Sequence, residues 1–223
     1  MLPSATNHNA GNRFNSLDAL RGVAALSIVF SHWNHFFDSG GTPAEILQDR
    51  LPLYSLFHIL YDDGHRAVDF FFCLSGFIFY FLYAEKISAH RVSAAEFSLL
   101  RFSRLYPLHL VTLIFVAGAQ SLMRSTQGAY FVYPNNDLFH FILQLTCSSA
   151  WGAWPHRNAF NGPFWSVSVE ILLYALFFVV CKFGFRRAFH LGLLVGLGFV
   201  LEYTPSLDLG RGVIAFFAGG LTF

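Results

Sequence analysis

The sequence predicts an all-α protein, a bundle of helices that crosses a membrane several times. Hydrophobic residues make up 55% of the 223 residues, phenylalanine alone contributes 28, and charged residues make up only 12%. Ordinary soluble domains carry roughly 25% charged residues, and a soluble fold of this size could not bury so much apolar surface. The apolar residues also gather in stretches of about twenty residues, the length that an α-helix needs to cross a bilayer.

Six or seven apolar stretches account for the predicted helices. In chain order they are Leu17–Phe37, Ala67–Ala84, Leu105–Met123, Leu138–Ala150, Phe164–Cys181, Phe189–Tyr203 and a stretch that begins near Val213. The fourth is too short to cross a bilayer comfortably, so we expect a re-entrant or interfacial segment, followed by a loop from Trp151 to Pro163. Non-helical backbone at that depth must be buried in protein or line a wet cavity, so we expect a cavity open to the outside.

The two ends of the sequence lead to two further expectations. Residues 1–16 are polar and lack the apolar core of a signal peptide, so we expect a polar tail before a transmembrane domain over residues 17–223. The last residues, VIAFFAGGLTF, stop inside an apolar stretch. We therefore expect a fragment of a longer protein, with a short terminal helix as the alternative.

The basic residues predict which loops face the cytoplasm. They gather after the second stretch and after the fifth, whereas the loop after the first stretch is rich in acidic residues. The basic residues in question are Lys86, Arg91, Arg101, Arg104, Lys182, Arg186 and Arg187. Because cytoplasmic loops of membrane proteins carry the excess of Lys and Arg, we expect a multi-pass protein of the cell membrane, in a bacterium the inner membrane, with its N-terminus in the cytoplasm.

Ionisable side chains inside apolar stretches are the first candidates for a functional site, because they are costly to place in hydrocarbon. Arg21 and His32 are eleven residues apart, about three turns, so they share one helix face roughly 16 Å apart along the axis. In the alternative interpretation Arg21 pairs with Asp18, and His32 lies at the membrane interface. His32 and His35 have a spacing that suits a metal, but no third ligand follows, so we expect no metal site.

The fifth stretch carries a polar stripe. Ser166, Glu170 and Tyr174 follow one another at four-residue intervals, so their side chains share one helix face. An unpaired glutamate in lipid is disfavoured, and the stripe should therefore face the bundle. Glu170 is thus either a functional residue or a structural one, which holds the bundle together by pairing with Arg21 or a histidine.

Two other groups of residues are weaker candidates. In the second stretch, Ser75 and Gly76 suit close helix packing, a G-x-S-x-G nucleophile motif is absent, and Asp69 is an interfacial or pairing residue at the outer end. Arg101 and Arg104 stand three residues apart at a predicted cytoplasmic helix start. Such a pair could grip phosphates, or it could be ordinary positive charge on the inner side.

Other functional classes find little support. The net charge is +1 and a basic stripe is missing, so nucleic acid is not an expected partner. Cys73, Cys147 and Cys181 lie far apart, without the spacing of a metal or redox site. His58 and Asp63 reproduce the H-x4-D spacing of soluble-faced glycerolipid acyltransferases, but two residues match easily by chance.

Four motifs, taken in order, resemble the membrane-bound acyltransferase type 3 family. They read LDALRGVAALSIVFSHW, VDFFFCLSGFIFY, LLRFSRLYPLHL and NGPFWSVSVEILLYALF, and the tail GRGVIAFFAGGL also fits. The resemblance covers about residues 17–181. Members of this family include O-acetyltransferases of O-antigens, exopolysaccharides, nodulation factors and peptidoglycan, and some macrolide acyltransferases.

The resemblance implies a domain of about ten transmembrane helices, of which this chain would hold the N-terminal two-thirds. It also implies an acyl-CoA donor, used as a substrate on the cytoplasmic side, and O-acyl transfer, most often of acetyl, to a hydroxyl of a sugar, a glycoconjugate or a lipid-linked glycan. No bound cofactor is expected.

The family motifs can be carried over residue by residue. R-x10-H matches Arg21 and His32, R-x-x-R matches Arg101 and Arg104, S-G-F matches Ser75, Gly76 and Phe77, and W-S-x-S-x-E matches Trp165, Ser166, Ser168 and Glu170. As a mechanism we expect His32 to be the general base, since an imidazole can accept a proton near neutral pH, with Glu170 or Asp69 orienting it. The three arginines would bind donor phosphates or stabilise developing charge. The alternatives are a transporter or channel whose charges line a pathway, and an inactive truncated relative.

Overall fold

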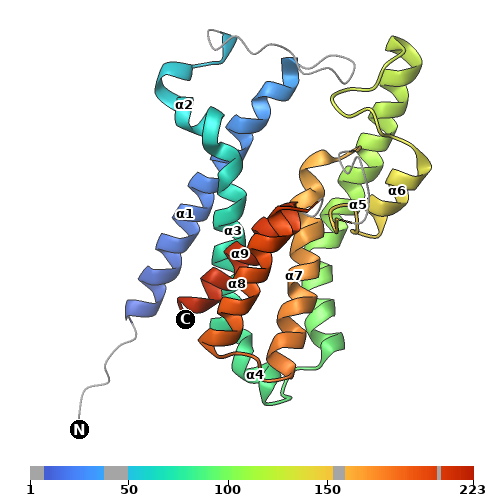
Figure 1. Ribbon diagram of the computed structural model, residues 1–223. Coiled ribbons are helices and arrows are strands. Elements are labelled where there is room, and N and C mark those ends of the chain that lie inside the picture. Colours follow the sequence, from blue (N-terminus) through green and yellow to red (C-terminus); the bar gives the residue numbers. More distant parts are fainter. Residues whose placement is uncertain (1–7, 38–49, 153–158, 205–206) are drawn as a thin grey trace. The chain divides into compact units, whose positions relative to one another are not determined.

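The computed structural model describes residues 8–37, 50–152, 159–204 and 207–223. Throughout these residues the regular structure is helical and contains no strand (Figure 1). The predicted all-α fold class is therefore confirmed. Two compact units make up the chain: an N-terminal unit of Met1–Phe36 and Glu45–Phe71, and a C-terminal unit of Phe37–Ala44 and Phe72–Phe223.

The N-terminal unit is built on one long helix. Its elements are α1 (His8–His32), α2 (Tyr54–Asp63), the 3-10 turn Gly64–Arg66 and the first residues of α3 (Ala67–Phe79); a 3-10 turn, Trp33–Phe37, follows α1. The first apolar stretch was predicted to begin at Leu17, and helix α1 begins nine residues before it. The boundary between a polar tail and the transmembrane domain stays a prediction.

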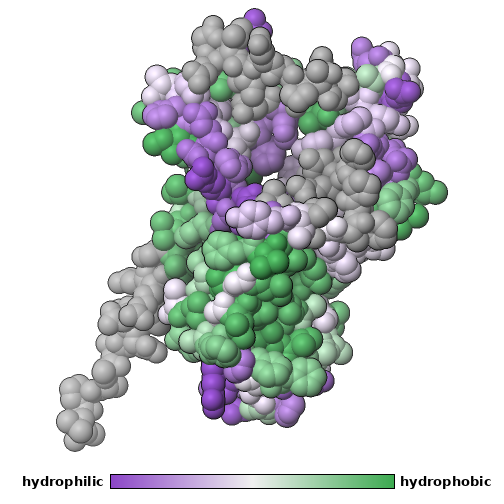
Figure 2. Space-filling view, viewed as in Figure 1, coloured by the Kyte–Doolittle hydropathy of each residue, from purple (hydrophilic) through white to green (hydrophobic). Residues whose placement is uncertain are grey.

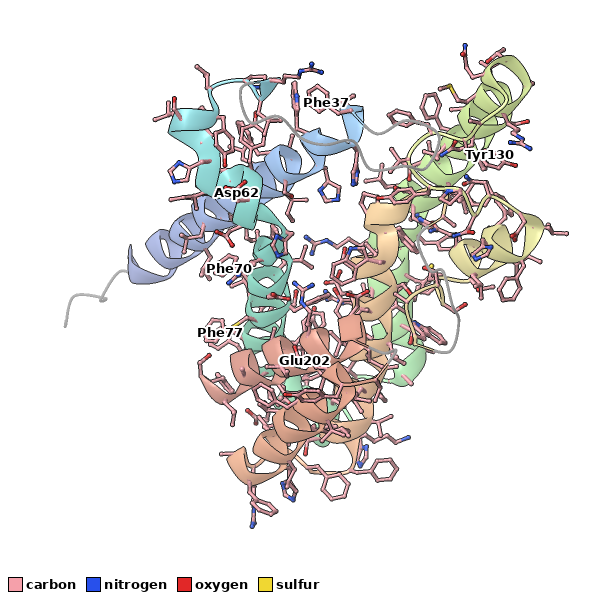
Figure 3. The ribbon with its side chains drawn as sticks, turned by 45° about the horizontal axis from the view of Figure 1, so that its top comes forward. Phe37, Asp62, Phe70, Phe77, Tyr130 and Glu202 are labelled. Atoms are coloured by element: carbon pink, nitrogen blue, oxygen red, sulfur yellow. The ribbon has the colours of Figure 1, made fainter. Side chains whose placement is uncertain are left out.

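Helix α2 was not predicted, because the charge pattern was interpreted as a plain loop between the first two stretches. It forms because its aromatic residues pack on α1: the ring of Phe30 lies 5.1 Å from the rings of both Phe57 and Tyr61. The chain then approaches α1 closely at Gly64, where an added Cβ would lie 2.2 Å from the carbonyl oxygen of Ser27. Figure 3 labels Asp62 at the end of α2.

The C-terminal unit contains the remaining helices. In chain order these are the rest of α3, a π-helix (Tyr80–Ala84), α4 (Glu85–Ser88), α5 (Ala94–Gln127), α6 (Leu138–Leu145), a 3-10 turn (Gly162–Phe164), α7 (Trp165–Lys182), α8 (Ala188–Glu202) and α9 (Leu207–Leu221). Helices α8 and α9 pack against each other, and α9 also packs on α7 (Figure 1). Phe77 on α3 and Glu202 at the end of α8 are labelled in Figure 3.

Helix α5 begins earlier than the sequence analysis placed it. Ser93 caps it, with its Oγ accepting a hydrogen bond of 3.1 Å from the backbone N–H of Glu96, and Gly128 ends it in a left-handed conformation with φ of 75°. Arg101 and Arg104 therefore lie inside α5, roughly 10 and 15 Å from its first residue, and not at a helix start or in a loop. That earlier expectation is wrong because the capping residue lies well before the apolar stretch.

Three helical stretches among the described residues are long and apolar enough to cross a membrane: Tyr54–Ser88, Ala94–Gln127 and Gly162–Lys182. Helices α8 and α9 have fifteen residues each, and the polar residues Asp18, Arg21 and His32 lower the hydropathy of α1. Figure 2 shows a hydrophobic surface over α8 and α9, with hydrophilic residues gathered beyond it at the α4 end of the same unit. These features are those of a membrane protein.

Glycines allow α3 and α9 to touch backbone to backbone. A Cβ at Gly76 would lie 1.8 Å from the carbonyl oxygen of Phe216, and one at Gly219 would lie 1.9 Å from that of Cys73. No side chain fits at either position, so the packing role predicted for Gly76 is confirmed. Around this contact the rings of Phe79, Phe177 and Phe216 form a tightly packed aromatic core.

Helix α6 folds back onto α5. It has eight residues, about 12 Å of rise, which agrees with the expectation that this segment does not cross. Two hydrogen bonds to backbone carbonyls hold it: Tyr106 Oη donates to Leu145 (3.1 Å), and His109 Nε2 bonds Gln144 (2.9 Å). Residues 153–158 of the following loop lie outside the described residues.

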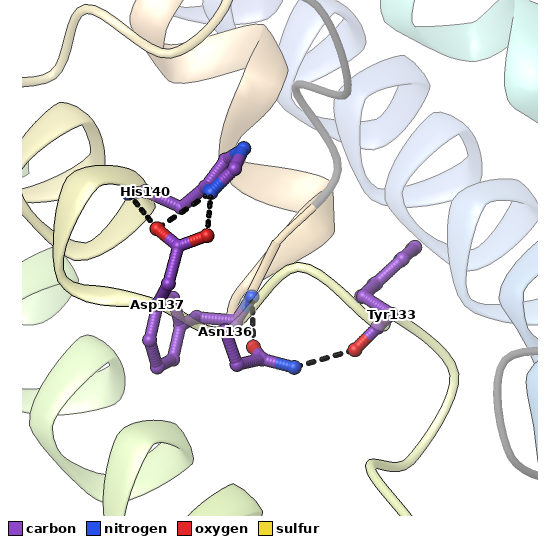
Figure 4. A network of polar contacts seen from close by, with 5 residues as sticks. Tyr133, Asn136, Asp137 and His140 are labelled. Carbon is purple, nitrogen blue, oxygen red and sulfur yellow. Dashed lines mark hydrogen bonds and ion pairs between the residues drawn. The ribbon is translucent and has the colours of Figure 1, made fainter.

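The segment that leads into α6 is a polar network (Figure 4). Asn136 donates to the carbonyl of Tyr133 and accepts from the backbone N–H of Phe160 at 2.7 Å. Asp137 caps α6 by accepting from the backbone N–H and the ring of His140, both at 2.9 Å. A cavity of about 330 Å³ lies beside this network, lined by Gln120, Arg124, Asn136 and Phe160 among others. Its position relative to the membrane stays a prediction.

Candidate functional site

Arg21 lies on α1 beside its own acidic neighbour. Its Nη1 is 3.5 Å from Oδ1 of Asp18, and the two side chains are 40% and 69% exposed. The local pairing considered in the sequence analysis is therefore present. An ion pair this exposed contributes only about 0–1 kcal/mol, so little opposes an exchange of the Asp18 carboxylate for an anionic ligand.

His32 is held in one tautomer by the last turns of α1. Its Nδ1 is 2.8 Å from the carbonyl oxygen of Ile28. Because a carbonyl can only accept, Nδ1 carries the proton of the neutral ring, and Nε2 keeps the lone pair. The ring is partly buried and meets the edge of His35 at 5.2 Å. Such an imidazole is ready to accept a proton through Nε2.

Asp69 lies in the same unit, in the first turn of α3, and its side chain is partly buried. Its predicted role in orienting His32 stays a prediction. The described residues contain no group of three or more His, Cys, Asp or Glu side chains that could hold a metal ion.

Glu170 is the centre of a second polar group, which lies in the C-terminal unit. It sits in the second turn of α7, partly buried, and its Oε1 accepts hydrogen bonds from Ser75 Oγ (3.4 Å) and from the hydroxyl of Tyr174. Ser75 stands on α3, so the carboxylate links two helices. Ser75 is thus a hydrogen-bond donor to Glu170 as well as a small residue in the packing, and the stripe of Glu170 and Tyr174 faces the protein as expected.

Both arginines of α5 act electrostatically on the Glu170 carboxylate, but their environments differ. Arg101 is partly buried: its Nη2 donates to the hydroxyl of Tyr83 at 2.5 Å, and its guanidinium lies 4.9 Å from the ring centres of both Phe79 and Tyr83. Arg104 is exposed, and no carboxylate of the described residues lies within 4 Å of it. Arg101 is therefore held in place by protein, whereas Arg104 can reach a ligand.

The W-S-x-S-x-E motif divides into structural and site residues. Ser168 is completely buried: its Oγ donates to the carbonyl of Cys147 at 2.8 Å and accepts from the N–H of Ala150 at 3.1 Å. Ser166 donates to the carbonyl of Pro163 at 3.2 Å. Both serines thus shape the turn before α7 and the segment after α6, and only Glu170 joins the polar group with the arginines.

Two residues that contact predicted site residues were not themselves predicted. Arg211 on α9 places its guanidinium 5.7 Å from the ring centre of Trp165; an arginine beside an apolar stretch is a signal that could have indicated it. Tyr83, the partner of Arg101, had no such signal, because its position depends on the π-helix Tyr80–Ala84.

Comparison with known proteins agrees with these features. The model of a family described as the acyltransferase domain matches residues 14–223. Protein 2 in the picA locus of Rhizobium radiobacter is 37% identical over 105 residues, 47% of this chain and 44% of that protein. The acyltransferase MdmB of Streptomyces mycarofaciens is 32% identical over 168 residues, 74% of this chain and 38% of that protein. No solved structure matches.

The matched residues span less than half the length of either relative. The family match, in contrast, covers almost all of this chain and includes every predicted site residue. The chain therefore belongs to the acyltransferase domain family, the membrane-bound acyltransferases of type 3 that its four motifs resemble.

Proposed function

We propose that the protein transfers an acyl group, most often acetyl, from acyl-CoA to a hydroxyl of a sugar or glycoconjugate. The observation that carries this proposal is the state of His32. Its Nδ1 proton is engaged by the Ile28 carbonyl, which leaves Nε2 as the acceptor that a general base requires. One relative, MdmB, is named an acyltransferase, which supports the same class of reaction.

The proposed reaction needs a single residue, His32, to take up a proton and to return it. Nε2 of His32 takes the proton of the acceptor hydroxyl while the oxygen attacks the thioester carbonyl. The carbon–sulfur bond then breaks, and the coenzyme A thiolate leaves and recovers the proton from the imidazolium. Hydrogen-bond donors close to the carbonyl oxygen would stabilise the negative charge that develops on it. Arg21 lies roughly 16 Å from His32 along α1, too far to contact that oxygen, and is proposed to bind an anionic group of the donor.

Arg101 and Arg104 are proposed to serve the donor. Exposed Arg104 would bind a donor phosphate through its planar fork of donors. Arg101, held by the hydroxyl of Tyr83 and the rings of Phe79 and Tyr83, would maintain the positive potential around it. The protein would act as a multi-pass protein of a bacterial inner membrane, with its N-terminus and donor in the cytoplasm and a glycan or lipid-linked glycan as acceptor.

The test uses the full-length protein in lipid nanodiscs with radiolabelled acetyl-CoA and a glycan acceptor. We expect acyl-CoA-dependent label in the glycan, and Arg104→Gln should raise the donor KM about tenfold or more, the loss expected for a charge-assisted contact. Arg124→Gln is the matched control, because Arg124 is also an exposed arginine of α5. Glycan movement across the membrane without any acyl transfer would instead establish a transporter.

A further inference from the structure

A second cavity, of about 570 Å³, lies in the C-terminal unit away from Glu170. Its walls come from the π-helix and α4, from the turn between α7 and α8, and from the end of α9. A volume of 300–1,000 Å³ is typical of sites for small organic ligands. This cavity is therefore large enough for a molecule well beyond the size of a single ion.

Its charged lining is mainly basic. Arg186 and Arg187 both face the cavity, and neither has a carboxylate within 4 Å in the part of the chain that the structure describes. The one acidic side chain of the lining, Glu85, already lies 3.9 Å from Arg91. The cavity thus offers two guanidinium groups whose charge is not balanced by protein.

The start of helix α8 adds further donors. Arg187 is its N-cap residue, and the Arg187 side chain makes no capping hydrogen bond. Ala188, the first residue of this fifteen-residue helix, lines the cavity. The first N–H groups of an α-helix have no partner within the helix, and the positive end of the helix dipole favours an anion there.

An independent observation comes from Tyr80. This residue lines the cavity and is 3% exposed, yet its hydroxyl has no hydrogen-bond partner among the described residues. Buried polar groups in native proteins are nearly always paired. Tyr80 also begins the π-helix, and single π-helical turns inside α-helices are frequent at functional sites.

We propose that this cavity is a binding site for the phosphate group of an amphipathic molecule. Arginine pairs and helix N-termini both favour phosphate, the Tyr80 hydroxyl would donate to it, and the apolar walls would accept the rest of the molecule. Two sources share this chemistry: the phosphates of coenzyme A, a source that rests on the proposed function, and the headgroup of an anionic phospholipid.

The test compares three variants of the full-length protein in nanodiscs. The double variant Arg186→Gln/Arg187→Gln removes the cationic groups, Tyr80→Phe removes only the hydroxyl, and Arg124→Gln, on α5, is the control. Binding of coenzyme A is measured by calorimetry, and retained phosphatidylglycerol is measured by native mass spectrometry. Losing one charge-assisted contact weakens binding about tenfold or more.

We expect the double variant to lose at least about tenfold either in its affinity for coenzyme A or in the amount of phosphatidylglycerol that it retains. Tyr80→Phe should lose severalfold in the same quantity. The control should keep wild-type values of both. Loss of coenzyme A binding identifies the donor as the source, and loss of phosphatidylglycerol identifies lipid. Unchanged values in both measurements for the double variant would overturn the proposal. Acyl transfer is assayed separately: loss of phosphatidylglycerol in a protein without transfer would uphold the site and reject the proposed function.

Discussion

The polar groups of the two units are built in opposite ways. In the N-terminal unit, Arg21 has a partner three residues away on the same helix, and both side chains are exposed. In the C-terminal unit, the Glu170 carboxylate accepts a hydrogen bond from Ser75, 95 positions away in the chain. It also interacts electrostatically with the two arginines of α5. In the first arrangement the two charges are neighbours on one helix and both remain in contact with solvent, whereas in the second the carboxylate is held by hydrogen bonds between helices and within α7. The two units should therefore respond very differently to the loss of a carboxylate.

The largest expected effect on stability is at Glu170. Glu170→Ala should lower the free energy of unfolding by about 3 kcal/mol, because it leaves the hydroxyls of Ser75 and Tyr174 without their acceptor, and each unpaired group costs about 1–3 kcal/mol. Asp18→Ala should cost at most about 1 kcal/mol, as expected for an exposed pair. Unfolding by SDS in bicelles measures both. Glu170→Gln keeps an acceptor for Tyr174, so its loss in free energy of unfolding should fall between those of the two alanine variants. Equal losses for Asp18→Ala and Glu170→Ala would contradict the distinction between the two units.

A second comparison uses glycines. Gly76→Ala should cost about 1–3 kcal/mol or more, the range for overpacking, because its new Cβ would meet the backbone of Phe216 at 1.8 Å. Gly22→Ala is the counterpart in α1. Apart from the neighbouring backbone of that helix, no atom of the described residues lies within 4 Å of the added carbon, and alanine should stabilise this helix by up to about 1 kcal/mol. The same SDS titration compares them. A harmless Gly76→Ala would mean that α3 and α9 do not touch as described.

The smallest effect concerns a local pair in the C-terminal unit. The hydrogen bond from the His140 backbone N–H, followed by the one from its ring, holds the pKa of Asp137 below its usual range. Because the pKa of Asp137 is lower in the folded protein than in the unfolded chain, the ionised carboxylate stabilises the folded state. This stabilisation is fully present above the ordinary pKa of an aspartate, about 3.9, and is lost as the pH falls through the lower folded value.

Asp137→Ala should therefore lower stability by about 1 kcal/mol at neutral pH, the usual loss for an N-cap. The difference between wild type and variant should shrink once the pH is below the folded value. Thermal unfolding midpoints at neutral and strongly acidic pH measure it. Asp137→Asn, which keeps an N-cap acceptor, serves as the control and should lose less than the alanine variant. A difference that grows on acidification would mean that His140 does not depress the pKa of Asp137.

Local patterns in the sequence were sufficient for part of this structure. Hydropathy predicted the helical class, and four-residue spacing predicted the stripe of Glu170 and Tyr174. Three-residue spacing indicated the pair of Arg21 and Asp18, as the alternative to a functional Arg21. The start of α5 was missed although its signal is readable, since Ser93 and Glu96 have the spacing of a capping box. An apolar stretch marks the part of a helix that faces lipid or core, and not its ends.

Other features had no local signal. Helix α2 exists because Phe57 and Tyr61 find Phe30 on α1, and a charge count contains no information on such packing. The difference between Arg101 and Arg104 had no local signal either, because the R-x-x-R motif does not distinguish the two arginines. Only the rings of Phe79 and Tyr83 hold Arg101 in place, and Arg104 has no such contact among the described residues. Contacts between distant segments decide these points.

The most direct test of the account is the loss of the base. In the full-length protein, His32→Ala should reduce acyl transfer by about 100-fold or more, the effect expected for a lost general base, while coenzyme A binding stays close to that of wild type. His58→Ala is the matched control, an exposed histidine of the same unit, and should keep wild-type transfer. If His32→Ala retains more than about a tenth of wild-type turnover, well short of that loss, His32 is not the base and Glu170 takes its place as the leading candidate.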